Sequence, residues 1–433
     1  MNDFYKEFPV KTDEEWLDLT RIQLKGKSIE EALHQTHPIE EIDYVSYGFN
    51  SNQKKSDLAP GEGNFLRGTK TTDNDWVNNI QIPHGSPKEM NAYALRFLMN
   101  GATGIKIDLA NFNATEIREI TKEIGLNHIS STFIYSTKEQ FDWLNENANV
   151  ETQMTAINTG KENFGLVKHA KNALIEAIDV QYAGGNVSQE IAYALHKGHE
   201  TLFQLMKSGL SVDEAAKQIK FLFGIGSNYF FELNKFRVFR ALWSTVVAAY
   251  QPKEADAAKA FIEVETGFIN KSLQDPHTNL LRQTTEVASA VLAGVDEVTV
   301  QPYNAWSKDS SESKEKAQHL GITIALLLKE ESYLDKVIDP AAGAYIIDEL
   351  YEQIKDKAWK LFQELENKGL DFLKEEIQRI AAIRIRAIEN QSATLIGVNK
   401  YFNIETVDST WDIQKKTAFG TPVVLEINAT IEK

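Results

Sequence analysis

Two histidines have the spacing that comes nearest to metal chemistry in this chain. His196 and His199 lie three positions apart in a predicted helix, so both rings would share one helix face. No third ligand is evident from the sequence. We therefore expect the pair on a solvated helix face and predict no metal site.

Acidic residues near predicted strand ends offer a second chemistry. Asp179, Glu263 and Glu265 could support metal-assisted hydrolysis if the chain were an unrelated barrel enzyme. That hypothesis requires a ligand triad, and we find none. The chain has no cysteine, which excludes thiolate chemistry, disulfides and Cys-ligated zinc or iron–sulfur sites.

A pair of arginines is the third candidate. Arg237 and Arg240 could bind phosphate. Their helix is expected on the outside of the fold, so we favour ion pairs or a subunit contact instead. Asp339, which precedes a proline, is expected to serve a turn or a helix cap.

The segment that carries these arginines reads as a strand followed by a helix. Phe221 to Ile225 is a short apolar run, closed by Gly224 and Gly226, which is typical of a buried parallel strand. Ser227 and Asn228 stand where a helix N-cap belongs. From Tyr229 the apolar residues recur at helical spacing.

The same strand–helix alternation occupies most of the chain. Eight repeats of this kind predict an α/β fold, a (β/α)8 TIM barrel. The strands are expected at Val77–Ile82, Gly104–Leu109, His128–Tyr135, Met154–Asn158, Leu174–Gln181, Phe221–Gly226, Phe261–Gly267 and Glu297–Pro302. The helices are expected at Lys88–Asn100, Ala114–Ile124, Lys138–Asn145, Glu162–Asn172, Ser188–Met206, Tyr229–Tyr250, Asn279–Leu292 and Ser313–Leu328.

Three regions follow from this pattern. Residues 1–70 form an N-terminal helical and extended arm that we expect to contact a partner subunit, with helical stretches at Asp13–Leu24 and Ser28–Leu33. Residues 71–390 hold the barrel and trailing C-terminal helices, one from Tyr345 and one at Leu370–Asn390. Residues 391–433 form a tail that includes a β-like TPVVLEI run.

Composition narrows the class of partner. The formal net charge is −16 and no basic tract is present, so we expect no nucleic acid and no anionic membrane surface as partner. No apolar run is long enough for a spanning helix, and the N-terminus is too polar for a signal peptide. A cytoplasmic protein is the expectation.

Several blocks of about residues 60 to 400 resemble the methylmalonyl-CoA mutase family. The most specific is FLFGIGSNYFFELNKFRVFRALW, where Gly226, Asn228, Glu232, Lys235 and Arg237 stand in the family's places. Further similar segments are VIDPAAGAYIIDELYEQIKDKAW, LIGVNKY and LRQTTEVASAVLAGVDEVTVQPYN. The arm EFPVKTDEEWLDLTRIQLKG resembles the N-terminus of the family's small subunit, which is thought to wrap the large one.

The resemblance implies a reaction and a cofactor. The family interconverts methylmalonyl-CoA and succinyl-CoA in propionate metabolism, and adenosylcobalamin supplies the radical. The acyl-CoA threads the barrel, and cobalamin closes the barrel's carboxyl face above a separate domain with an Asp-x-His-x-x-Gly loop. No histidine here has that surrounding sequence, and the chain is expected to end too early for such a domain.

The family's polar clusters are altered in this chain. Where competent relatives carry Tyr-His-x-x-Glu-Ala-Gly, this sequence has degenerate positions at Ile178, Asp179 and Tyr182, and only Ala183 and Gly184 persist. Asp179 cannot donate to a thioester oxygen unless it is protonated. The resemblance leaves Ala183, Gly184 and Glu331, which stands where relatives keep a Glu near the adenosyl group, as candidate cofactor contacts.

Two further departures concern charge. No arginine occurs between Arg118 and Arg237, so the family's bidentate clamp on the substrate carboxylate is missing. Glu263 and Glu265 replace polar residues that meet the CoA end, and carboxylates are a poor lining for a polyphosphate.

Taken together, these residues predict no catalytic residue on this chain. We interpret the chain as the small subunit of a heterodimeric adenosylcobalamin-dependent methylmalonyl-CoA mutase, non-catalytic itself and stabilising the large catalytic subunit. The cofactor is expected on that partner and not on this chain. The alternative is the catalytic barrel of a different acyl-CoA mutase that borrows a cobalamin domain in trans.

Overall fold

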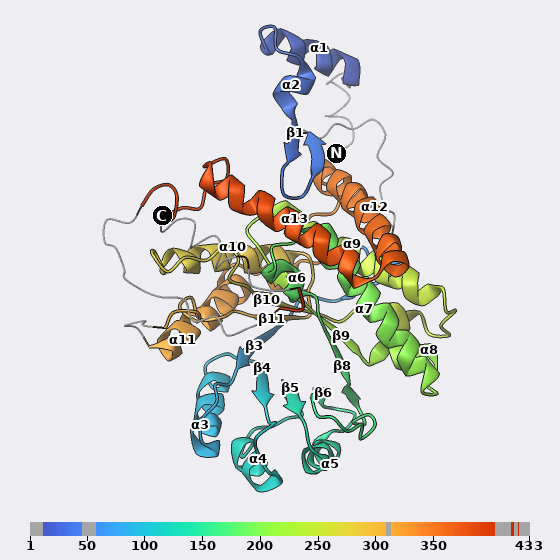
Figure 1. Ribbon diagram of the computed structural model, residues 1–433, viewed down its shortest axis with the longest axis vertical. Coiled ribbons are helices and arrows are strands. Elements are labelled where there is room, and N and C mark those ends of the chain that lie inside the picture. The colour runs from blue at the N-terminus through green and yellow to red at the C-terminus, as the bar shows by residue number, and fades with distance from the viewer. Residues whose placement is uncertain (1–11, 46–57, 309–312, 403–416, 420–422, 424–433) are drawn as a thin grey trace, which may run out of the picture.

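A computed structural model describes residues 12–45, 58–308, 313–402, 417–419 and 423 of the 433-residue chain (Figure 1). The predicted β-like run at 421–427 lies outside the described residues except for Val423. No helix among the described segments is both long and apolar enough to cross a bilayer.

The centre of the fold is a closed parallel sheet. Its hydrogen-bonded order is β7-β6-β5-β4-β3-β11-β10-β9-β8. The bounds are β3 Val77–Gln81, β4 Gly104–Asp108, β5 Ser130–Tyr135, β6 Gln153–Asn158, β7 Ala170–Lys171, β8 Ala173–Glu176, β9 Ile219–Ile225, β10 Ile262–Thr266 and β11 Glu297–Thr299. A strand begins near each of the eight expected positions, although the fifth ends earlier than predicted, and the predicted TIM barrel is confirmed.

The fifth strand closes the barrel in two pieces. β7 pairs with β6, and β8 pairs with β9, with only Asn172 between the two pieces. The Asn172 side chain accepts a hydrogen bond from the Val167 amide at 2.8 Å and donates to the Val167 carbonyl at 3.0 Å. This side chain fixes the break in the strand and the loop before it.

Helices alternate with the strands as the sequence predicts, except between β6 and β7. Their bounds are α3 Pro87–Leu98, α4 Ala114–Ile120, α5 Lys138–Asn147, α6 Ile178–Tyr182, α7 Val187–Lys207, α8 Val212–Lys217, α9 Tyr229–Ala248, α10 Thr278–Leu292 and α11 Lys314–Leu326. Capping boxes at Ser86, Asn113, Thr137 and Asn186 begin four of them, because each cap side chain satisfies an otherwise unpaired amide of the first turn.

Two predictions at the fifth repeat are wrong. No helix forms at Glu162–Asn172; that segment contains Gly165 and the left-handed His169, and it is a loop that leads into β7. The strand predicted to Gln181 ends at Glu176, after which α6 begins. A short apolar run fits a buried strand and a buried helical turn equally well, so its periodicity could not separate them.

α9 is the most deeply buried helix of the outer layer. Phe221 of β9 lies 4.7 Å from the Phe239 ring and 4.9 Å from the Trp243 ring of α9. α7, α10 and α12 (Tyr345–Lys368) all pack against α9. A helix enclosed on this many sides carries apolar residues around most of its circumference, as the sequence of α9 does.

The N-terminal arm reaches the barrel through a hairpin. The arm comprises α1 Asp13–Gln23, α2 Ile29–Leu33, β1 His34–His37 and β2 Ile42–Val45. In the hairpin, Glu41 accepts from the Arg379 guanidinium of α13 (Leu370–Glu389) at 2.5 and 2.9 Å. Beyond the hairpin, α1 projects away from the barrel with Leu19 and Ile22 exposed (Figure 1).

Candidate functional site

The lumen of the barrel contains a buried ionic network. Lys106 of β4 lies 2.7 Å from a Glu263 oxygen of β10, although two strands separate them in the sheet. Lys220 of β9 lies 2.8 Å from the other Glu263 oxygen and also contacts Glu297 of β11. Contacts between strands that are not neighbours are possible only across the lumen. The network therefore lies where a ligand threading the barrel would pass.

Neutral groups complete the network. Asn79 donates to Glu297 at 2.8 Å, and the Thr299 hydroxyl donates to Glu263 at 2.9 Å. Lys220 reaches the Thr132 hydroxyl of β5, on the far wall, at 3.3 Å. A buried charge is tolerated when it is both paired and hydrogen-bonded, and these contacts supply both.

Glu263, Lys106 and Lys220 are held in their charged forms at neutral pH. Burial alone would raise the pKa of Glu263, but Lys106 and Lys220 together lower it to about 2. Burial opposes the charge on Lys220, yet Glu263 and Glu297 raise the pKa of that ammonium above its usual value. The lumen is thus held by fixed charges of opposite sign.

Aromatic side chains close the carboxyl end of the lumen. Tyr182 of α6 stacks on Phe268, with ring centroids 4.0 Å apart and planes 6° apart. The Tyr182 hydroxyl donates to Glu265 at 3.2 Å. Ile178 and Leu222 pack into the same cluster. Two of the degenerate positions, Ile178 and Tyr182, therefore fill space above the ionic network.

Asp179, the third degenerate position, faces the C-terminal tail. Its carboxylate accepts a hydrogen bond from the Ala418 amide at 3.1 Å. The next residue, Phe419, packs its ring against Tyr193 of α7 at 5.1 Å. The tail thus covers the side of α6 on which Asp179 lies.

Ala183 and Gly184 lie beneath α13. Gly184 has a φ of +95°, and a β-carbon there would stand 2.7 Å from the β-carbon of Ala381. Arg384 donates to the carbonyl oxygens of Gly184 at 3.3 Å and Gly185 at 3.0 Å. The glycine is required for the close approach of α13.

Glu331 lies at the opposite end of the barrel. It ends a π-helical turn, Leu327–Glu331, that follows α11. Lys329 of that turn contacts Asp75, two residues before β3 begins, and the Asn74 amide donates to the Asp335 carbonyl at 2.6 Å. The structure therefore does not bring Glu331 together with Ala183 and Gly184.

The prediction that His196 and His199 lie on a solvated helix face is wrong. His196 is 8% exposed and its Nδ1 lies 2.6 Å from Glu366 of α12, while His199 Nε2 lies 2.8 Å from the Tyr250 hydroxyl. α12 covers this helix face, which the sequence of α7 alone could not show. Across the described segments, no group of three or more His, Asp or Glu side chains could hold a metal ion.

The arginine pair is used in packing. Arg237 forms a buried ion pair with Asp339, which also accepts from Arg67 at 3.0 Å. Arg240 instead donates to the backbone oxygens of Phe65 and Ala293. The predicted ion pair is confirmed for Arg237, and Asp339 serves as its partner in a turn.

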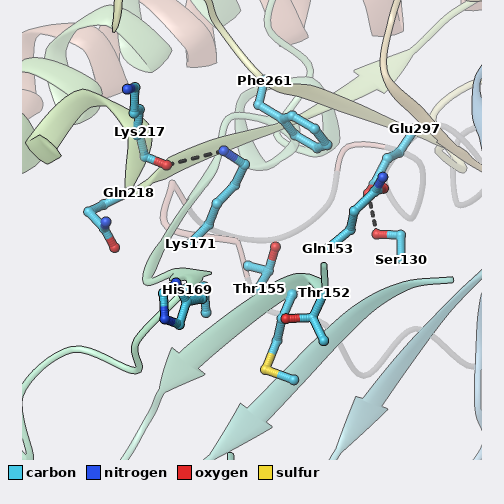
Figure 2. A pocket seen from close by; sticks show the side chains of 12 residues that line it. Ser130, Thr152, Gln153, Thr155, His169, Lys171, Lys217, Gln218, Phe261 and Glu297 are labelled. Carbon is cyan, nitrogen blue, oxygen red and sulfur yellow. Dashed lines mark hydrogen bonds between the residues drawn. The ribbon is translucent and has the colours of Figure 1, made fainter. Parts of the chain in front are cut away.

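Each mouth of the barrel has a cavity. The amino-face cavity, of about 350 Å³, is lined in part by Phe261, Lys171 and Lys217 (Figure 2). There Lys171 donates to the Lys217 carbonyl at 3.1 Å, and its ammonium lies 4.7 Å from the centre of the Phe261 ring. The carboxyl-face cavity, of about 660 Å³, has Tyr182 and Glu265 among its lining residues.

Sequence reasoning found Glu263 but missed its partners. Lys106 and Lys220 each stand between two apolar residues of a strand, whereas Glu297 begins β11 directly after Asp296. Charged residues at alternate positions of such strands signal an inward-facing polar layer. That signal was present, but the pairing of the charges required the closed barrel.

The fold and site together define a parallel (β/α)8 barrel whose lumen is occupied by its own charged and aromatic side chains. A model of the methylmalonyl-CoA mutase family matches residues 163–418. The chain is 31% identical to the methylmalonyl-CoA mutase small subunit of Porphyromonas gingivalis over 409 residues, which covers 84% of this chain and 64% of that protein. The chain belongs to the methylmalonyl-CoA mutase family.

Other relatives match with different coverage. The methylmalonyl-CoA mutase of Cereibacter sphaeroides is 31% identical over 234 residues, covering 52% of this chain and 33% of that protein. The mitochondrial methylmalonyl-CoA mutase of Bos taurus is 25% identical over 456 residues, covering 89% and 60% respectively. The chain thus spans less than two thirds of the length of these relatives.

Proposed function

We propose that this chain is the non-catalytic small subunit of a heterodimeric methylmalonyl-CoA mutase and stabilises a large catalytic subunit. The observation that carries the proposal is the occupied lumen. Lys106, Lys220, Glu263 and Glu297 meet across the barrel where, by the family resemblance, an acyl-CoA would thread. Admitting a pantetheine chain would require separating buried ion pairs, which is costly because each partner would be left uncompensated.

We also propose that the partner binds adenosylcobalamin. The groups at the carboxyl face of this chain fit such a cofactor poorly. Tyr182 is stacked on Phe268 and projects over the lumen, and Asp179 is bonded to the tail at Ala418. Gly184 is enclosed by Ala381 of α13. No step of the reaction is therefore assigned to residues of this chain.

The N-terminal arm is the part that we propose contacts the partner. α1 shows Leu19 at 57% and Ile22 at 74% exposure, three residues apart. An amphipathic helix rarely leaves such a stripe in water unless another surface covers it. The hairpin anchors this helix to the barrel through Glu41 and Arg379.

Co-expression with the catalytic subunit tests the proposal. We expect the two chains to co-purify, and deletion of residues 1–33 to abolish co-purification while the barrel stays folded by circular dichroism. Titration with adenosylcobalamin, followed by its visible spectrum, should show binding to the complex but not to this chain alone. Tight binding and turnover by this chain with a stand-alone cobalamin domain would favour the alternative, a catalytic barrel for another acyl-CoA.

A further inference from the structure

The carboxylates of the ionic network differ in how closely lysines approach them. Within the described lumen, Glu263, Glu265 and Glu297 each lie near Lys106 or Lys220, and Lys171 adds a third ammonium group near Glu297 at the amino end. Glu263 contacts both Lys106 and Lys220, and Glu297 contacts Lys220. Glu265 lies 3.5 Å from Lys106, which is closer to Glu263. Of the three carboxylates, Glu265 therefore has the weakest contact with an ammonium group.

Glu265 is also the member of this network that reaches the carboxyl-face cavity. Its side chain keeps 13% exposure, whereas those of Glu263 and Glu297 keep 0% and 1%. The Tyr182 hydroxyl donates to it from the same cavity wall. The carboxylate thus forms part of the cavity floor and carries a charge that the protein compensates only in part.

Aromatic rings form much of the wall around this carboxylate. Tyr93, Tyr182, Phe268 and Trp306 all line the cavity. Phe268 stacks on Tyr182 and meets the Trp306 ring edge-to-face at 5.5 Å. Ring faces attract cations through their quadrupole, and the attraction is strongest where water is excluded.

The described charges around the cavity are of both signs. Burial raises the pKa of Tyr182 most, and Glu265, Asp179 and Glu176 raise it further, which indicates a negative field at the floor. At the rim, Glu315 is paired with Arg96, and the exposed Lys314 belongs to the first turn of α11.

We propose that the carboxyl-face cavity binds a small organic cation, with the ammonium group against Glu265 and the aromatic rings around it. A volume of about 660 Å³ is in the range of small-molecule sites. A metal ion is disfavoured because no set of three His, Asp or Glu ligands occurs in the described residues. An anionic acyl group would be repelled by the same carboxylate. The inference concerns this barrel alone and does not depend on the partner subunit.

Choline and its neutral isostere 3,3-dimethylbutanol provide the test. In the isostere a carbon atom replaces the charged nitrogen of choline with nearly the same shape, so the comparison isolates the effect of the positive charge. We expect isothermal titration of the full chain to detect choline binding with at least about ten-fold preference over the isostere. Succinate, an anionic probe, should not bind. Equal affinity for choline and isostere, absence of choline binding at about 10 mM, or tighter binding of succinate would each overturn the proposal.

Three variants locate the site. Glu265→Gln should weaken choline binding at least about ten-fold while leaving the weak binding of the isostere unchanged. Glu315→Gln is the matched control, since its carboxylate lies at the same cavity but is already paired with Arg96, and it should change affinity less than about two-fold. Trp306→Leu should also weaken choline binding, which keeps the test valid if Glu265→Gln folds poorly. Equal losses in the Glu265 and Glu315 variants would refute the assignment.

Discussion

Removing the Lys220 ammonium should show how much the free energy of unfolding depends on the charge pairs in the lumen. Lys220→Met keeps the length and apolar stem of the side chain but removes the ammonium. Glu297 then loses its lysine, and Glu263 retains only Lys106. Breaking a buried pair from one side costs about 3–5 kcal/mol, because the remaining carboxylate stays desolvated and uncompensated.

The depressed pKa of Glu263 gives an independent value, of the same order, for how much the buried ion pairs stabilise the folded state. A fall from 4.5 to about 2 in the folded state corresponds to about 3 kcal/mol of stabilisation. This stabilisation is present above the unfolded pKa near 4.5 and is lost as the pH falls through the folded value near 2. Lys106 and Lys220 share this stabilisation, so removal of Lys220 alone should forfeit only part of it, in addition to the uncompensated charge left on Glu297.

Urea unfolding at pH 7.5, followed by circular dichroism, measures the loss. Lys217→Met is the matched control, since Lys217 is half exposed and its ion pair with Glu254 lies at the surface. We expect that control to change stability by less than about 1 kcal/mol. The double variant Lys220→Met with Glu297→Gln restores the charge balance and should recover much of the loss. A Lys220→Met chain within about 1 kcal/mol of the parent, or a double variant no more stable than the single one, would refute the reasoning.

Three other perturbations have defined outcomes. Burial raises the pKa of Glu40 to about 7, so the docked hairpin holds a proton on Glu40 between pH 4.5 and 7, where the undocked hairpin does not. The free energy of docking should therefore weaken by up to about 3 kcal/mol as the pH rises through that window. Hydrogen exchange of the hairpin amides measures this change, and Glu40→Gln should remove its pH dependence. Gly184→Ala should destabilise the fold by about 1–3 kcal/mol more than Gly165→Ala, as measured by thermal unfolding. Both glycines have a positive φ, but of the two only Gly184 has atoms close to where a β-carbon would stand. Equal losses of stability in the two variants would contradict this prediction. Asp339→Asn should cost about 3–5 kcal/mol in urea unfolding by leaving Arg237 buried without its carboxylate, and a neutral result would show that other groups compensate.

The sequence by itself determined the barrel and the approximate positions of its strands, apart from the end of the fifth. The run at 219–225 and the helical spacing of α9 are local patterns, and each can be read within one element. The N-cap expected at Ser227 or Asn228 is found at Asn228, although its side chain makes no capping hydrogen bond to α9. The family resemblance also rested on contiguous segments, which a linear reading detects well.

Only the tertiary structure decided what fills the lumen. Lys106, Lys220, Glu263 and Glu297 are spread over almost 200 positions of sequence, and they meet because the sheet closes. The same holds for His196, whose cover by α12 turns an expected solvated face into a buried contact. Local periodicity shows which face of an element is buried. It does not show what that face meets, because long-range packing decides which charges pair and which carboxylate, here Glu265, reaches a cavity.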